Sequence, residues 1–167
     1  LLMVGLIISN SAALLRDQIE ILRRRERQTQ ALNNLSRELT AAISLEDVFK
    51  IVIRNVGEMF NREAVGLLPA GEKLTQRACT PGFEITESEQ AVADWAFKNG
   101  KPAGRGTDTL SAAAIRYIPL ITARGTVGVL GLKPFDPQNN LSIDQTLLME
   151  GVVNICGIAI ERASFAE

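Results

Sequence analysis

The sequence predicts an α+β fold, with a central antiparallel sheet and long N- and C-terminal helices packed on one face of that sheet. Residues 11–42 contain neither proline nor glycine and carry apolar residues at helical spacing. Strand-like runs lie on either side of Ala70-Gly71-Glu72 and again on either side of residues 123–126, which is typical of hairpins. A final helix follows the second hairpin. Hairpins at both ends of the sheet favour antiparallel over parallel pairing.

Composition narrows the possible functions of the chain. A length of 167 residues suits one domain with some extra helix, and 46% hydrophobic residues suffice for an ordinary core. The net charge of −1 gives no reason to expect a nucleic-acid partner. The chain has no histidine, which excludes Ser-His-Asp and Cys-His catalysis, His-ligated metals and a phosphoaccepting histidine within it. The two cysteines lack metal-ligand spacing, so we expect no metal site.

The first ten residues favour a membrane connection. Residues 1–8 are entirely apolar but fall short of the roughly 20 residues that span a bilayer. The basic segment RDQIEILRRRER follows, as expected for a cytoplasmic juxtamembrane stretch. We therefore expect residues 1–10 to be the end of a transmembrane helix. The alternative is a buried N-terminal helix or strand.

Residues 11–43 are predicted to form an arginine-rich signalling helix. Leu15, Ile19 and Leu22 recur at spacings of four and three, which indicates a seam that pairs with another chain. Apolar spacing resumes in the second half of the helix, which we expect to lie on the domain. The arginines of the first half are either a solvated helix face or a sensing surface, and they include Arg23, Arg24, Arg25 and Arg27.

Residues 44–167 are predicted to form the globular domain. Ser44, with Asp47 three residues later, indicates the start of its first helix. Strands are expected over 63–68, ended by Pro69, and over 73–79. Thr86 or Ser88 begins the next helix, which ends at Asn99-Gly100. The carboxylates near that start are expected to be solvated, and they are Glu84, Glu87 and Glu89.

A glycine-rich loop precedes the second hairpin. Gly104 and Gly106 allow φ > 0 there, and the next three residues offer side-chain oxygens to the loop backbone or to a ligand. The last helix begins at Ser142 and is apolar on two adjacent faces, so it needs both its own sheet and a second subunit as partners. The face expected to form the dimer and signalling contact comprises Leu148, Val152, Ile155 and Ala159, and the adjacent face comprises Met149, Val153, Cys156 and Ile160.

Residues 96–110, AFKNGKPAGRGTDTL, resemble the loop after the third helix in the GAF domains of KdpD-type sensor histidine kinases. RYIPL and ARGTVGVLGLKP, residues 116–120 and 123–134, are similar to the last two strands of those domains. The resemblance implies a regulatory module on the cytoplasmic side of a bacterial inner membrane, without catalysis of its own. It further implies a kinase domain in the same protein, a potassium response through a response regulator, and a homodimer formed by the N- and C-terminal helices.

The resemblance leaves two functions open. One is a mechanical relay from membrane helices to kinase. The other is a domain whose bound nucleotide, metabolite or ion regulates the kinase, because GAF domains commonly bind small molecules under a loop-helix cover. No cofactor is expected and the ligand is unknown. Alternatively, the threonines and Asp108 only cap the loop and Arg105 pairs with an acid. The candidate ligand residues are Trp95, Arg105, Thr107, Asp108, Thr109 and Tyr117.

Overall fold

A computed structural model describes residues 1–166, and the chain divides into two compact units, Leu1–Asn34 and Leu35–Glu167. The first unit consists of most of helix α1 (Leu2–Ala41), whose side chains there are almost all exposed. The helix expected over residues 11–43 is present and begins earlier, at Leu2. Its seam residues Leu15, Ile19 and Leu22 are 59%, 48% and 63% exposed.

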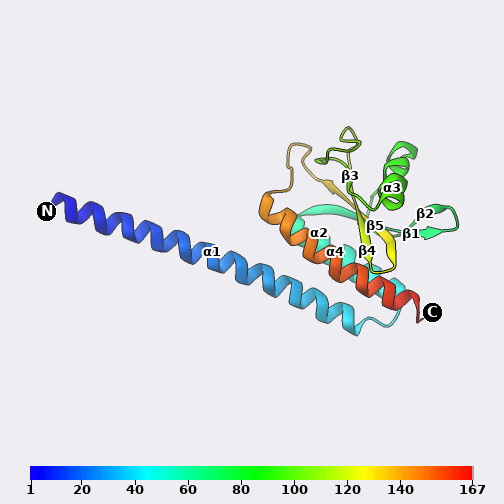
Figure 1. Cartoon of the computed structure of the whole chain (residues 1–167), viewed down its shortest axis with the longest axis horizontal. Coiled ribbons are helices and arrows are strands. Elements are labelled where there is room, and N and C mark those ends of the chain that lie inside the picture. The colour runs from blue at the N-terminus through cyan, green and yellow to red at the C-terminus, as the bar shows by residue number, and fades with distance from the viewer. Residues whose placement is uncertain (167) are drawn as a thin grey trace. The chain divides into compact units, whose positions relative to one another are not determined.

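The second unit contains a five-stranded antiparallel sheet with the strand order β2-β1-β5-β4-β3 (Figure 1). Helices α2 (Leu45–Phe60) and α4 (Ile143–Ser164) cover one face, and α3 (Glu87–Asn99) covers the other. This arrangement confirms the predicted α+β class. The strands are β1 Arg62–Ala70, β2 Lys73–Cys79, β3 Ala103–Gly104, β4 Arg116–Thr122 and β5 Gly125–Pro134.

The helix boundaries follow local side-chain chemistry. The Ser44 hydroxyl accepts from the Asp47 N–H at 3.1 Å, and the Asp47 carboxylate accepts from the Ser44 N–H at 3.3 Å. This reciprocal capping box satisfies two donors that a helix start leaves unpaired. Ser142 forms the same arrangement with the residue three positions later. Gly100, with a φ of 60°, ends α3 in the left-handed conformation, as expected, and Thr86 caps its start.

Two features of the sheet differ from the prediction. Strand β1 continues through Pro69 to Ala70, where the sequence predicts an end at Pro69. Proline is tolerated because the pairing of β1 with β5 ends at Leu67, so Pro69 has a neighbouring strand on one side only. The second difference is β3, whose two residues are too few to give a sequence pattern.

Part of the α4 face that was expected to contact a second subunit is buried inside the domain. Val152 and Ala159 are only 0% and 7% exposed, because this face of α4 packs on the sheet and on α2. They belong to the core and cannot contact a second subunit. The apolar side chains of α4 that remain outside include Leu147 and Ile158. Among residues 1–166, α4 is also the helix whose length and hydropathy suit a membrane span, although it packs here as a core helix.

Candidate functional site

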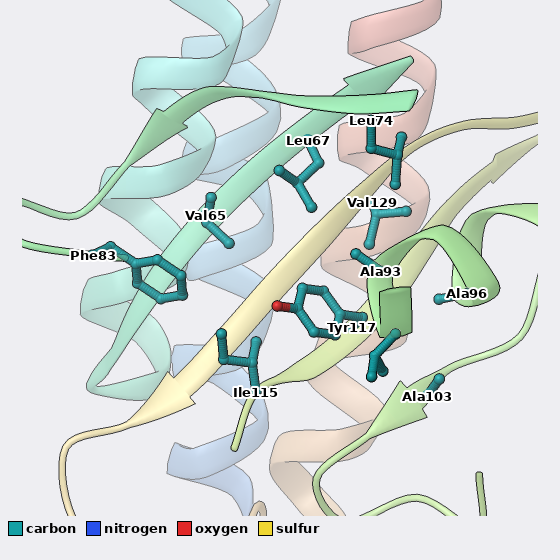
Figure 2. Close-up of a cluster of buried hydrophobic side chains, with 11 residues drawn as sticks. Val65, Leu67, Leu74, Phe83, Ala93, Ala96, Ala103, Ile115, Tyr117 and Val129 are labelled. Atoms are coloured by element: carbon teal, nitrogen blue, oxygen red, sulfur yellow. The ribbon is translucent and has the colours of Figure 1, made fainter. Parts of the chain in front are cut away.

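The α3 face of the sheet, where a ligand pocket is predicted, is filled by side chains. Figure 2 shows Tyr117 among these side chains, which come from the strands, from α3 and from the segments that flank them. Tyr117 is 0% exposed, and Trp95 packs on this cluster while partly buried. Both residues therefore contribute to a core. The cluster comprises Val65, Leu67, Leu74, Phe83, Val92, Ala93, Ala96, Ala103, Ile115, Tyr117 and Val129.

Glu89 lies at the border of this cluster, although the sequence predicts a solvated carboxylate. It is 9% exposed, and its Oε1 accepts from the Ala114 N–H at 2.7 Å. That hydrogen bond ties α3 to the segment before β4. The other carboxylate oxygen and the Tyr117 hydroxyl are buried without a hydrogen-bond partner. Burial, then the nearby Glu89 charge and the approach of its carboxylate to the hydroxyl, raise the pKa of Tyr117 far above its usual value.

The glycine-rich loop is stabilised by its own threonine. The Thr107 hydroxyl lies 2.7 Å from the Gly104 carbonyl oxygen and 2.8 Å from that of Thr109, and it accepts from the Thr109 N–H at 3.3 Å. Asp108 is exposed. Gly104 and Gly106 have φ values of 91° and 69°, as predicted. The loop-capping alternative therefore describes Thr107.

Arg105 instead lies beside two arginines that the sequence did not single out. Arg62 at the start of β1 and Arg116 at the start of β4 flank the end of β5, with Arg62 opposite Pro134 and Arg116 opposite Leu132. A pocket of ≈ 150 Å³ lies between them, and we call it the arginine pocket. Its lining residues are Arg62, Arg105, Gly106, Arg116, Leu132, Pro134, Asn140 and Leu141.

The three arginines of this pocket concentrate positive charge in a partly enclosed place. Arg62 is 5% exposed and donates from Nη2 to the Asn139 carbonyl oxygen at 2.8 Å. Arg116 donates from Nη1 to the Gly106 carbonyl oxygen at 3.2 Å. The Nε atoms of all three are buried without an acceptor, and within residues 1–166 none of the three forms an ion pair. Burial, followed by the charges of Arg105 and Arg116, lowers the pKa of Arg62.

The alternation of side chains along a strand indicates from the sequence that two of these arginines, Arg62 and Arg116, lie on a buried face of the sheet. Side chains two apart share a face of a strand, so Arg116 points to the same side as Ile118, which is buried. By the same alternation Arg62 shares a face with Ala64. An arginine in register with buried residues is unusual, because arginine is almost never fully buried unless it is paired. The convergence with Arg105 depends on strand order and is not visible in the sequence.

A second feature of the second unit joins three helices. Arg162 of α4 donates from Nη2 to the carbonyl oxygen of Leu39 in α1 at 2.6 Å. Glu38 of α1 accepts from Asn55 of α2 at 3.0 Å and pairs with Arg54. Leu39 itself is 2% exposed. The last turns of α1 thus bond to both α2 and α4, the two helices that cover the same face of the sheet.

Residues 44–162 match the family model described as a GAF domain. The chain belongs to the GAF domain family. This GAF domain is 30% identical over 162 residues to the sensor protein KdpD of Escherichia coli (strain K12), covering 97% of this chain and 18% of that protein. It is also 30% identical over 132 residues to the sensor protein KdpD of Clostridium acetobutylicum, covering 72% and 15%. The chain thus spans less than a fifth of either relative.

The solved structures agree with this assignment. The crystal structure of the GAF domain of the E. coli potassium sensor histidine kinase KdpD superposes with a TM-score of 0.72 at 26% identity, covering 82% of this chain and 95% of that one. The resemblance inferred from residues 96–134 is confirmed. As a GAF domain, the chain is a regulatory module and not an enzyme. Within residues 1–166, no His, Cys, Asp and Glu side chains gather in a group of three or more that could hold a metal ion.

Proposed function

We propose that this GAF domain is the sensory module of a membrane-bound, KdpD-type sensor histidine kinase of a two-component potassium response. In this proposal α1 enters from membrane helices, the domain lies on the cytoplasmic side of a bacterial inner membrane, and α4 leads toward the kinase core. The similarity to two KdpD sensor proteins supports the placement in this kind of kinase. The kinase domain acts on a response regulator, with which this domain has no direct contact.

The proposed relay is supported mainly by the contact between the last turns of α1 and the end of α4. Leu35 and Leu39 are 0% and 2% exposed, so the last turns of α1 are part of the core. Arg162 connects the same turns to the end of α4. Because cores are close-packed, a shift of these turns changes the packing of α4. A relay then needs two packings that differ by only a few kcal/mol.

The exposed seam of α1 supports a homodimer. Leu15, Ile19 and Leu22 form an apolar stripe that is open within the first unit. Pairing with the same stripe of a second copy removes it from water. Residues 1–10 then continue into the bilayer, and the following arginines, including Arg23 and Arg27, meet anionic headgroups.

The test of this proposal replaces Leu15, Ile19 and Leu22 with serine and measures association by sedimentation velocity. Weaker association is expected, together with a changed potassium response of the membrane-bound kinase. Ile21→Ser is the matched control, because Ile21 is 53% exposed and lies about 200° around the helix from Ile19. Association that is unchanged in the triple variant, or equally weakened in the control, would overturn the dimer.

One observation favours the second candidate function, which is regulation by a bound small molecule. The arginine pocket is a partly open site lined by three arginines, and the relay does not require it. A ligand there would act on the same domain and would not replace the signal that enters through α1.

A further inference from the structure

We propose that the arginine pocket binds an oxyanion of the phosphate class, either inorganic phosphate or the phosphoryl group of a small metabolite. The pocket lies on the α2/α4 side of the sheet, opposite the filled cluster under α3. All of its lining residues belong to the second unit. The inference rests on that geometry alone and stands whether or not the domain relays a membrane signal.

The charge of the lining favours a dianion. Three guanidinium groups face the pocket, and its lining contains no carboxylate. Like charges held together in a partly buried place repel one another strongly, since the local dielectric constant is low. Such an arrangement costs stability and is more typical of a binding site than of a structural core. An anion with two negative charges offsets most of this repulsion.

The donors of the pocket match oxygen acceptors. The Nε–H groups of Arg62, Arg105 and Arg116 have no acceptor among the described residues. A buried donor without a partner costs free energy, so an acceptor in the pocket is stabilising. A guanidinium presents its N–H groups as a planar fork that fits two oxygens of one phosphate. Arg62 is rigid in this role, because it is 5% exposed and is held by the Asn139 carbonyl oxygen.

The size of the pocket selects a single group. Its volume of ≈ 150 Å³ is below the range of about 300–1,000 Å³ that is usual for organic ligands. A phosphoryl group fits this space, whereas a whole nucleotide does not. In a phosphate ester, the organic part therefore remains outside.

Bound anion would also fix the segment that leads into α4. Asn140 and Leu141 line the pocket and immediately precede the N-cap Ser142. An oxyanion that binds the arginines of β1 and β4 would also contact this segment and hold it against the sheet. The expected consequence is lower mobility at the start of α4.

The test follows inorganic phosphate by ³¹P NMR titration of the whole chain and by thermal unfolding. Line broadening and a rise in melting temperature are expected with phosphate but not with chloride at equal ionic strength. Arg105→Gln and Arg116→Gln should each weaken binding by about ten-fold or more. Arg77→Gln is the control, since Arg77 is exposed and lies outside the pocket. This variant should bind phosphate as the unchanged chain does.

A parallel titration with glycerol 3-phosphate separates the two sources of the anion. Tighter binding of the ester than of phosphate identifies a metabolite, and the reverse identifies inorganic phosphate. The proposal is overturned if neither probe binds the unchanged chain, or if Arg77→Gln weakens binding as much as Arg105→Gln. The titration of the unchanged chain shows by itself whether phosphate binds. The test therefore still gives a result if one of the variants fails to fold.

Discussion

The guanidinium of Arg162 donates a hydrogen bond to the main-chain carbonyl of Leu39, 123 residues away in the sequence. The last carbonyls of a helix lack partners within that helix, and α1 has no basic residue in its own last turn. Arg162 of α4 therefore caps α1 from another helix. The end of α1 and the end of α4 thus depend on each other directly.

Arg162→Gln should loosen the last turn of α1. The shorter side chain is expected to lose the bond to Leu39, at a cost of about 1 kcal/mol because Arg162 is exposed. Hydrogen exchange should become faster for the amides of residues 38–43, with little change in β5. Arg37→Gln removes an exposed arginine of α1 that has no such bond. Equal exchange rates in the two variants would show that the bond does not stabilise this turn.

Leu39→Ala should destabilise the second unit far more than Leu14→Ala. Leu39 is 2% exposed and Leu14 is 61% exposed. Removing a buried leucine side chain costs about 2–5 kcal/mol, because the lost burial adds to the cavity that remains. Urea unfolding followed by Trp95 fluorescence measures the difference. Similar midpoints for both variants would mean that the end of α1 is not part of the core.

Tyr117→Phe should leave stability at pH 7 unchanged or raise it by about 1 kcal/mol. The substitution removes a buried hydroxyl that makes no hydrogen bond of normal geometry, although the Glu89 carboxylate lies close enough to raise its pKa. Chemical unfolding at pH 7 measures the effect. A loss of more than about 2 kcal/mol would indicate that the hydroxyl is satisfied after all.

The same residue predicts a loss of stability at high pH. The folded pKa of Tyr117 is raised, so above its ordinary value of about 10 the unfolded chain releases the phenolic proton first. The stability that Tyr117 contributes is complete below about pH 10 and declines above it by about 1.4 kcal/mol per pH unit. Burial also raises the pKa of Cys156 to about 12. The thiol therefore lowers the stability of the fold at high pH as well, and its effect begins at a lower pH because the ordinary pKa of a thiol is lower than that of a phenol. Tyr117→Phe should remove only the tyrosine part.

The chain offers a direct readout of that titration, because Tyr117 is its one tyrosine. Tyrosinate absorbance near 295 nm should remain absent in the folded domain at pH 11 and should develop only on unfolding. A smooth titration near pH 10 without unfolding would contradict the burial of this hydroxyl.

Gly104→Ala should destabilise the domain more than Gly71→Ala. Both glycines have positive φ, at 91° and 68°, so each substitution strains the backbone. At Gly104 a Cβ would also lie 2.1 Å from the Ile115 carbonyl oxygen, whereas at Gly71 it meets open space. We expect a loss of roughly 1 kcal/mol at Gly71 and at least twice that at Gly104. Differential scanning calorimetry measures both, and equal losses would contradict the close approach at Gly104.

Local chemistry made much of the fold predictable. Ser44, Ser142 and Gly100 mark helix ends through side-chain oxygens or positive φ, which act within a few residues. The turn between β4 and β5 is equally local. The burial of Glu89 was not predicted, because its hydrogen bond reaches 25 residues along the chain.

The candidate site shows the same limit. Arg105 was singled out for its glycine-rich loop, yet its neighbours are set by the order of strands in the sheet. Arg62 and Arg116 meet across β5, and no spacing in the sequence expresses that adjacency. Tyr117 was expected beside a ligand, but it fills the interior instead, among side chains of β1, β5 and α3.

The short strand β3 leaves most of β4 without a neighbour on its outer side, since pairing there is confined to residues 116 and 117. An open strand edge normally invites addition of a strand from another molecule. Pro119 lies on this edge and has no N–H to offer to such a strand. Extension of the sheet by a strand from another molecule is therefore disfavoured along this part of β4.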